Sequence, residues 1–562
     1  MKWMAAALSA ALLTTACSGT GGNSNTASPS ESSGQTASPS PSASPEADKE
    51  PINLGKYDPP VELSYVGTIA ANIKFDEGDS YEKNGVTAAY ERDLGIILKK
   101  LWTVEANQYS QKVMLSISSN DMPDLMRVTL EELNQMVEND MLADLTDVYN
   151  DYATEETKKF MTSDGGKQLE SAMFNGRLMA IPATNSPFNS AQFIYIRNDW
   201  LSSLGLEPPK TMDELLAVAE AFTTKDPDGN GKDDTYAFAA MKEPYNDQYG
   251  FKGIFFGYHA YPGAWIKDDS GQLVYGSTLP EMKEALQALQ DMYAKGLIDK
   301  EFFTKDHGKA NELVANDRVG MAFGTFSASS YPLQAAVVKN NKVTQDWSVF
   351  PLVSVDQRQP NNLVGLGVTN YYVVSKNAQH PEAVIKILNR WIEVDNTPLT
   401  DETRFYKFGL QNQGYWQLNP IVVAPQNLNA EIGGVLSKAV EAKDPKDLSH
   451  PNGLQLYSEA IDYLNGVEDK WASWMKARPG GSLEIMHQYG QNNQYVYNEF
   501  YGAPTPAMAE RKAILDTKEQ EMLIDIITGG SLDKFDAFVA EWKSLGGDAM
   551  TKEVNEWYAS LK

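Results

Sequence analysis

Short apolar runs alternate with amphipathic stretches along most of this chain. Residues 61–67, VELSYVG, predict a buried strand, and a helix around Thr87–Leu94 leads into a second strand. A short strand follows at 124–128, and QFIYIRNDWLSSLGL at 192–206 reads as a strand that runs into a helix. After about Ala430 the pattern is mostly helical. This alternation predicts layered α/β structure with a helix-rich C-terminal region, rather than a β-barrel or a helix bundle.

Two helix starts carry a specific signal. Thr129 stands three residues before Glu132, and Thr211 stands three residues before Glu214. A threonine followed at this spacing by glutamate is typical of a capping box, in which the hydroxyl accepts a hydrogen bond from a backbone amide of the first turn. We therefore expect helices to begin just after Thr129 and Thr211.

The N-terminal residues predict a targeting signal. Lys2 gives a thin positive region, and MAAALSAALL, Met4–Leu13, is an apolar run too short to span a bilayer. Small residues then precede Cys17, the only cysteine of the chain, which has no second thiol for a disulfide. The pattern resembles a bacterial lipoprotein signal peptide (1–16) whose cysteine is lipidated. The alternative is a chance cysteine near an ordinary cleavage site.

The stretch that follows Cys17 is almost without apolar side chains. Residues 18–50 are rich in Ser, Gly and Pro. Such a segment cannot bury enough surface to offset its ordering entropy, so residues 17–55 are expected to form a disordered tether. Two or more acyl chains hold a protein stably on a membrane. No later run of 18 uninterrupted apolar residues occurs, so the lipid is the only membrane anchor expected.

Composition limits the possible partners. The chain has 562 residues, of which 42% are hydrophobic and 10% aromatic, enough for two lobes with separate cores. A formal charge of −27 argues against nucleic acid and against adsorption to anionic lipid, since both require a basic surface. The 27 tyrosines and 11 tryptophans favour a protein that also uses rings to bind something.

The strongest chemical motif is DPDGNGKDDT at 226–235. Oxygen donors fall at the loop positions that wrap around a hard cation, and Gly231 permits the sharp turn. The expected ligands are four side chains and one backbone carbonyl: Asp226, Asp228, Asn230, Lys232 (carbonyl) and Asp234. An EF-hand would close with glutamate where this chain has Ala237, so we expect a weak structural Ca²⁺ site rather than a sensor. The alternative is an acidic turn without metal.

The chain shows no motif for catalysis. Its five histidines are scattered, and no nucleophile elbow, phosphate-binding loop or HExxH is present. A pair of carboxylates of the kind used by glycosidases stays open, because 75 acidic residues offer many pairs. We therefore expect a binding protein rather than an enzyme.

Several segments together resemble family 1 extracellular solute-binding proteins of ABC importers, in the branch of large LipO-like lipoproteins of Gram-positive bacteria. A Tyr-x-Arg-x-Asp-Trp motif at 195–200 is followed by a Leu-Gly turn, Pro-Lys-Thr and the calcium-type loop. The loop SSNDMPDLMRV also matches, with Asn120 where the family has glycine. The matching segments are 118–128, 174–182, 194–238, 371–391 and 541–558. The resemblance covers essentially Glu62 to Lys562.

The resemblance implies a two-lobed clamshell of the type II periplasmic-binding-protein kind. Lobe 1 would hold 56–183 and part of 370–562, and lobe 2 would hold 184–369, including the calcium-type loop, and the rest of 370–562. An oligosaccharide would bind in the cleft between the lobes and be delivered to an ABC permease. The protein would work as a monomer, lipid-anchored on the extracellular face of the cell membrane.

The resemblance and the residues together give candidates for the ligand site. The Gly/Pro-broken segment 255–276 carries three rings, in a region where the family often places a stacking aromatic; the alternative for each is core packing. Two further candidates occupy the matched loop of lobe 1, one lies near the first lobe crossing and one in 405–418. The candidates are Tyr258, Tyr261, Trp265, Asn120, Asp121, Asn185 and Trp416. Trp200 and Trp542 are expected in the core.

Other functions stay open at this point. A peptide could replace the sugar, an anchored polysaccharide-active enzyme could use a carboxylate pair, or the clamshell could present its ligand to a sensor kinase. Intact recovery of a bound glycan separates import from hydrolysis.

Overall fold

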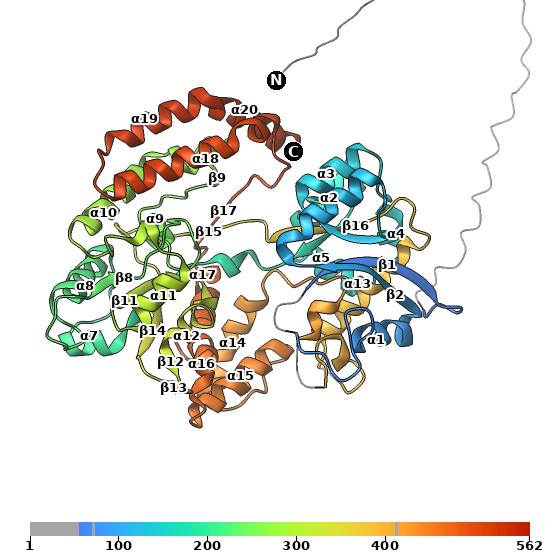
Figure 1. Cartoon of the computed structure of the whole chain (residues 1–562), viewed down its shortest axis with the longest axis horizontal. Helices are drawn as coiled ribbons and strands as arrows, with labels where there is room; N and C mark the ends of the chain where they lie inside the picture. Colours follow the sequence, from blue (N-terminus) through green and yellow to red (C-terminus); the bar gives the residue numbers. More distant parts are fainter. Residues whose placement is uncertain (1–54, 70–72, 399, 411–413, 562) are drawn as a thin grey trace, which may run out of the picture. The chain divides into compact units, whose positions relative to one another are not determined.

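The computed structural model describes residues 55–69, 73–398, 400–410 and 414–561 (Figure 1). The predicted signal peptide, Cys17 and almost all of the predicted tether lie outside these residues. In the described part of the chain, no helix combines the length and the apolar character that a membrane span requires.

The first sheet has five strands in the order β2-β1-β3-β16-β6. β1 runs parallel to β2 and β3, whereas β16 is antiparallel to β3 and to β6. The strands are β1 (Val61–Thr68), β2 (Ile96–Val104), β3 (Leu125–Val128), β6 (Ile181–Thr184) and β16 (Val368–Val374). Three of them match the strands expected at 61–67, after Leu94 and at 124–128.

The second sheet has four strands in the order β14-β7-β11-β8. β7 is antiparallel to both of its neighbours, and β11 runs parallel to β8. The strands are β7 (Phe193–Arg197), β8 (Tyr236–Phe238), β11 (Val319–Gly324) and β14 (Trp347–Phe350). The remaining strands are short: β4 (Met173–Phe174), β5 (Arg177–Leu178), β9 (Trp265–Lys267), β10 (Leu273–Tyr275), β12 (Val338–Lys339), β13 (Lys342–Val343), β15 (Asn362–Val364) and β17 (Tyr495–Tyr497).

Each sheet has its own apolar packing. Helices associated with the first sheet are α1 (Gly85–Leu94), α2 (Tyr109–Ser119), α3 (Leu130–Glu138), α4 (Thr146–Tyr152), α5 (Glu155–Met161), α6 (Lys167–Glu170) and α13 (Pro381–Asn396). Two buried clusters serve the second sheet. One includes residues of α7 (Asn198–Leu204), α8 (Met212–Thr224), α9 (Lys252–Gly257), α10 (Pro280–Ala294), α18 (Pro506–Ile527), α19 (Asp533–Trp542) and α20 (Asp548–Ser560). The other includes residues of α11 (His307–Ala315), α12 (Leu333–Val337), α14 (Leu428–Ala442), α15 (Pro451–Leu464), α16 (Trp471–Ala477) and α17 (Ser482–Gln491). The helix-rich C-terminal region expected from the sequence is confirmed.

Three connections join the two sheets within the described residues. They lie between β6 and β7, between β14 and β16, and between Ala424 and α14. Hydrogen bonds hold them together: the Thr184 hydroxyl donates to the Ala424 carbonyl at 3.0 Å, and the Asn185 amide donates to the Gly367 carbonyl at 2.8 Å. The crossing segments therefore form a common support for the residues that flank them.

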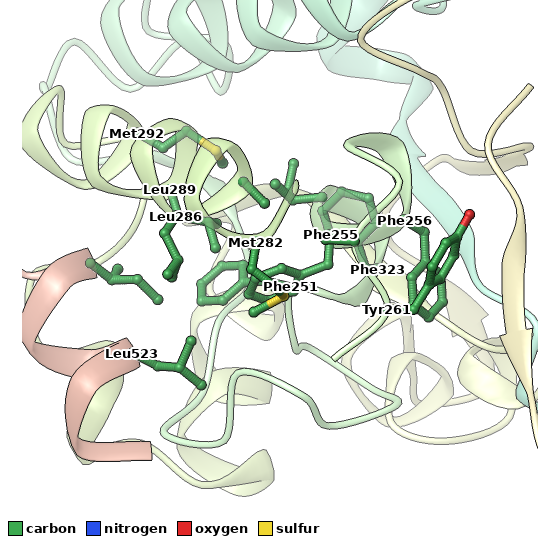
Figure 2. Packing of buried hydrophobic residues seen from close by; sticks show 14 of the residues in the cluster. Phe251, Phe255, Phe256, Tyr261, Met282, Leu286, Leu289, Met292, Phe323 and Leu523 are labelled. Atoms are coloured by element: carbon green, nitrogen blue, oxygen red, sulfur yellow. The ribbon is translucent and has the colours of Figure 1, made fainter. Parts of the chain in front are cut away.

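Figure 2 shows part of the apolar cluster of the second sheet, where Met282, Leu286 and Leu289 of α10 lie close to Phe251 and Phe255. Leu523 of α18 approaches the same cluster, so C-terminal helices complete a core that begins at Ile194, about 330 residues earlier in the chain. The predicted core positions of Trp200 and Trp542 are confirmed, with 1% and 5% of their surface exposed.

Both predicted helix starts are confirmed, with one difference in their bonds. Thr129 accepts from the Glu132 amide at 3.2 Å, and the Glu132 carboxylate accepts from the Thr129 amide at 2.8 Å, which completes a capping box. Thr211 accepts from the Glu214 amide, but the Glu214 carboxylate accepts from the amide of Lys210, one residue earlier.

Candidate ligand-binding site

A cavity of about 310 Å³ lies at the edge of the first sheet where β1 and β6 end and β16 begins. Amides, hydroxyls, one guanidinium and three aromatic rings line it. The lining residues are Val66, Gly67, Thr68, Tyr109, Arg127, Ala183, Thr184, Asn185, Thr369, Asn370, Tyr372, Trp416, Gln417, Asn419, Pro420, Val422 and Ala424. Ligand sites of α/β proteins commonly lie beyond the carboxyl ends of strands, where loops supply the contacts.

Irregular pairing in two strands shapes this edge. The register between β1 and β2 shifts between Tyr65 and Val66, so that Val66 pairs with Trp102 and Leu101 is skipped. The pairing of β16 with β6 shifts between Val368 and Tyr371. Bulges of this kind re-aim side chains, and here the residues next to each shift line the cavity.

Trp416 is the exposed aromatic ring of the cavity. It lies in the single turn η7 (Tyr415–Leu418), and 46% of its surface is exposed. Its neighbour Tyr415 is fully buried, donates its hydroxyl to Asp79 at 2.7 Å and accepts from the Asp76 amide at 2.7 Å. The buried neighbour therefore holds the backbone of the turn, and the turn presents the tryptophan ring at the cavity.

Asn419 follows this turn and holds it by hydrogen bonds. Its Nδ2 donates to the carbonyls of Tyr406 at 2.6 Å and Trp416 at 3.1 Å, and its Oδ1 accepts from the Tyr90 hydroxyl at 2.9 Å. Because Asn419 is only 9% exposed, losing these bonds would leave buried polar groups unpaired. Its contribution to a ligand site is thus mainly to hold Trp416 in place.

Two tyrosines form the buried wall. The Tyr372 hydroxyl donates to the Val422 carbonyl at 3.1 Å and accepts from the Val422 amide at 2.9 Å, which holds the crossing segment against the sheet. Burial raises the pKa of Tyr109 to about 12 and also raises the pKa of Tyr372. Both hydroxyls are therefore neutral hydrogen-bonding groups at physiological pH.

Asn185 is exposed at the start of a crossing segment, where it lines the cavity as well. Its side-chain oxygen accepts from the Ser186 amide at 2.8 Å and from Asn189 Nδ2 at 3.2 Å. These bonds orient the side chain and occupy its oxygen, so its NH₂ group is the part that can donate to a ligand. Of the seven ligand-site candidates from sequence, the cavity brings together Asn185 and Trp416.

The aromatic segment 255–276 lies elsewhere, in the core of the second sheet. Trp265 is 5% exposed, with its ring centroid 5.3 Å from Tyr275 and 6.3 Å from Trp542. Tyr261 is 7% exposed, and its ring lies beside Phe256 (Figure 2). Tyr258 is half-buried against the same cluster. None of the three rings lines this cavity, so their part in ligand binding stays a prediction; Trp542 of α19 packs on Trp265.

Asn120 and Asp121 are exposed at the far end of α2 from the cavity. Asn120 takes the left-handed conformation, φ 51°, and the Asp121 amide donates to the Ser116 carbonyl at 3.1 Å, which ends the helix. Tyr109, at the other end of this 11-residue helix, lines the cavity about 16 Å away along the axis. Both residues therefore cap a helix, and neither lines this cavity.

Several lining residues, notably Arg127, Tyr109 and Asn370, were not predicted from the sequence. A signal for Arg127 existed, because it is the one charged residue in the apolar strand LMRV. Asn370 had no such signal, since its place depends on the irregular pairing of β16.

The calcium-type loop is held by its own side chains. Asp226 accepts from the amides of Asn230 at 3.0 Å and Gly231 at 2.9 Å. Asn230 Nδ2 donates to Asp228 at 2.7 Å and to Asp234 at 3.2 Å. Partial burial and the neighbouring Asp226 and Asp234 carboxylates raise the pKa of Asp228. The Asn230 NH₂ group thus lies between the carboxylates of Asp228 and Asp234, while Asp226 accepts from backbone amides.

This donor set fits a hard cation. The carboxylates of Asp228 and Asp234 already converge on one NH₂ group, and rotation of the Asn230 amide would turn its oxygen toward them. In the described residues as they stand, however, no three Asp, Glu, His or Cys side chains are placed to hold a metal ion together. A bound cation would replace the NH₂ group and relieve the repulsion among the acids.

The fold resembles that of solved binding proteins. The Streptococcus pneumoniae ABC-transporter substrate-binding protein FusA, in complex with kestose, matches with a TM-score of 0.59 and 17% identity, over 89% of this chain and all of that chain. A second structure of FusA, described as an EF-hand mutant in complex with fructo-nystose, matches equally well. The α/β, two-lobed fold class expected from the sequence is confirmed.

Three characterised proteins are similar in sequence. Lipoprotein LipO of Bacillus subtilis is 25% identical over 501 residues, which cover 86% of this chain and 90% of LipO. FusA is 25% identical over 55% of this chain and 57% of its own length. The polygalacturonan/rhamnogalacturonan-binding protein YtcQ of B. subtilis is 34% identical over 24% of this chain and 26% of YtcQ.

The sequence model of one family matches residues 78–392, more than half of the chain, and carries the description bacterial extracellular solute-binding protein. FusA is named a substrate-binding protein of an ABC transporter and YtcQ a polysaccharide-binding protein, and neither is named as an enzyme. The chain is a member of the bacterial extracellular solute-binding protein family.

Proposed function

We propose that this protein captures an oligosaccharide in the cavity at the edge of the first sheet and delivers it intact to an ABC permease. The observation that carries the proposal is the half-exposed Trp416 ring in a cavity lined by amides and hydroxyls. A sugar ring has an apolar face of C–H bonds and a polar rim, so it matches an aromatic platform with hydrogen-bonding groups around it. The ligand class is supported by two relatives: FusA is named a fructooligosaccharide-binding protein, and YtcQ is named a polygalacturonan/rhamnogalacturonan-binding protein.

Capture would use the two sheets as separate lobes joined by the three crossing segments. A ligand that contacts both lobes favours the closed state by its differential affinity for that state, and closure is then the signal to the permease. The lobe boundaries expected from sequence remain predictions, as does the monomeric state.

Titration of the full-length chain with neutral sugars, acidic sugars and peptides tests the proposal. We expect micromolar binding of at least one oligosaccharide, about −8 kcal/mol, with the ligand recovered intact by mass spectrometry. Cleavage of the ligand would favour an anchored polysaccharide-active enzyme, and binding of peptides alone would favour a peptide-binding lipoprotein.

The lipid anchor belongs to the same proposal. Acyl chains on Cys17 would keep the protein on the extracellular face of the membrane beside its permease. Cys17→Ala should release the protein into the medium and abolish labelling by a fatty-acid analogue. Unchanged membrane association of the variant would contradict the anchor.

We also propose that loop 226–235 binds a structural Ca²⁺. The side-chain oxygens of Asp226, Asp228, Asn230 and Asp234 and the Lys232 carbonyl would hold it, and the ion would neutralise the clustered acids. At a Ca²⁺ concentration ten times Kd, the folded state gains about 1.4 kcal/mol, so a chelator should lower Tm. Asp228→Asn should remove this response, whereas Asp269→Asn, an exposed acid of another turn, should keep it.

A further inference from the structure

The charge of the cavity is opposite to that of the protein. The chain has 75 acidic and 48 basic residues. The described residues that line the cavity, however, include no Asp or Glu, and the one charged side chain among them is Arg127. A negatively charged surface repels anions at long range. The described residues that line this cavity add no carboxylate to that repulsion, and Arg127 opposes it.

Arg127 lies on β3, where it pairs in register with Tyr372 of β16. Its guanidinium carbon is 5.6 Å from the centroid of the Tyr109 ring, and the side chain is exposed. It forms no ion pair with any carboxylate of the described residues. A guanidinium held by an aromatic face with its N–H groups available is suited to bidentate binding of a carboxylate.

A second cation, Lys100 of β2, lies close to the lining residue Gly67. Lys100 Nζ is 4.9 Å from the Tyr65 ring centroid and 5.3 Å from the Tyr81 ring centroid. It is also 3.6 Å from the point that a Cβ on Gly67, a lining residue, would occupy. Lys100 likewise pairs with no carboxylate of the part of the chain that the structure describes. One cation without a carboxylate partner among the described residues thus lines the cavity, and a second lies beside the lining residue Gly67.

We infer that the ligand is an acidic oligosaccharide, one of whose sugar carboxylates binds Arg127, with Lys100 adding positive charge behind it, while a ring stacks on Trp416. The inference rests on the proposed function and narrows its ligand class. A neutral sugar needs only hydrogen-bond donors and acceptors, which Asn185, Asn370 and Gln417 already supply. A carboxylate would neutralise charge that otherwise has no partner in the cavity.

The test compares a trigalacturonate with its methyl ester, which keeps the same sugar skeleton without the charge. Calorimetry on the full-length chain should give at least tenfold tighter binding of the acid. Arg127→Gln should reduce affinity for the acid at least tenfold and for the ester much less, and Arg127→Lys should retain an intermediate affinity. Arg177→Gln, an exposed arginine outside the cavity, is the matched control and should change neither.

The outcomes separate this inference from the proposed function. Tighter binding of the ester or another neutral oligosaccharide, or an equal loss of both ligands in Arg127→Gln, would overturn the inference and leave oligosaccharide capture standing. Binding of no oligosaccharide at all, acidic or neutral, would overturn the proposed function itself.

The pH profile examines Lys100. Burial lowers its pKa to about 8, against a smaller opposite effect of Glu82; the groups that face it are Glu82 and the Tyr65 and Tyr81 rings. A bound carboxylate would raise this pKa, so binding would take up protons and affinity for the acid should fall as pH rises through 8. Lys100→Gln should flatten the profile. A profile already flat in the unmodified chain would overturn the part assigned to Lys100.

Discussion

Segments 255–276 and 405–424 are alike in composition but different in surroundings. Each carries a tryptophan beside tyrosines in a stretch broken by glycine and proline. Trp416 of the second segment is 46% exposed in a cavity, whereas Trp265 of the first is 5% exposed. The stacked pair of Tyr275 and Trp542, with centroids 5.0 Å apart and planes at 2°, lies directly beside Trp265.

The two segments differ in exposure because later helices of the chain cover the first segment and not Trp416 of the second. Trp542 of α19 packs on segment 255–276, and Tyr275 at its end donates its hydroxyl to Glu519 of α18 at 3.2 Å. In segment 405–424, the buried side chains of Tyr415 and Asn419 hold the backbone by hydrogen bonds, and Trp416 stays exposed. Whether an aromatic loop is buried or exposed therefore depends on which helices, distant in sequence, pack against it.

Trp265→Ala tests the buried member and should have the largest effect. Removal of a buried tryptophan loses its transfer free energy and leaves a cavity, which costs about 3–5 kcal/mol. Chemical denaturation should show this loss as a lower midpoint, while ligand affinity of the folded fraction stays unchanged. An unchanged midpoint with lost binding would instead make 255–276 the ligand site.

Trp416→Ala tests the exposed member and should give the reverse. Loss of the stacking surface should weaken binding about tenfold or more, about 1.4 kcal/mol, with the denaturation midpoint nearly unchanged. Trp416→Phe, which keeps an aromatic face, should recover part of the affinity. If both Trp416 variants bind as the original chain does, the cavity is not where the ligand stacks.

Local signals were enough to predict much of the fold. The strand at 61–67, the helix before Gly95 and the capping threonines follow from periodicity and short-range hydrogen bonding, which the sequence records directly. The fold class came from the order of such elements and from resemblance. The calcium-type loop was recognised by spacing alone, since its donors are nearly consecutive.

The candidate ligand site was predictable only in part, because the residues that line the cavity meet through long-range contacts. Asn185 could be found from its position near a sheet crossing, and Trp416 from its broken loop. Arg127 and Asn370 come together only when β16 pairs with β3 and β6, some 180 to 250 residues away in sequence. The burial of Trp265 depends in the same way on packing against α19, which the residues near position 265 do not predict.

Glu519→Gln tests the helix that covers segment 255–276, and we expect it to have the smallest effect on stability. Glu519 is 4% exposed, accepts from the Tyr245 hydroxyl at 2.8 Å and from Tyr275, and pairs with no cation of the described residues. Burial raises its pKa above the ordinary value of 4.5. The folded state therefore holds this proton more tightly than the unfolded state, and the associated stability is complete below pH 4.5 and lost as pH rises through the folded-state pKa.

The glutamine variant has no charge to bury, so its stability should not decline over that range. Measured by denaturation from pH 4 to 8, it should gain on the original chain as pH rises, by about 1.4 kcal/mol for each unit by which the pKa is raised. Glu521→Gln, an exposed position of the same helix, should run parallel to the original chain. If Glu519→Gln also runs parallel, then the carboxylate is not held in a low-dielectric site, and α18 does not seal segment 255–276 from water as its 4% exposure requires.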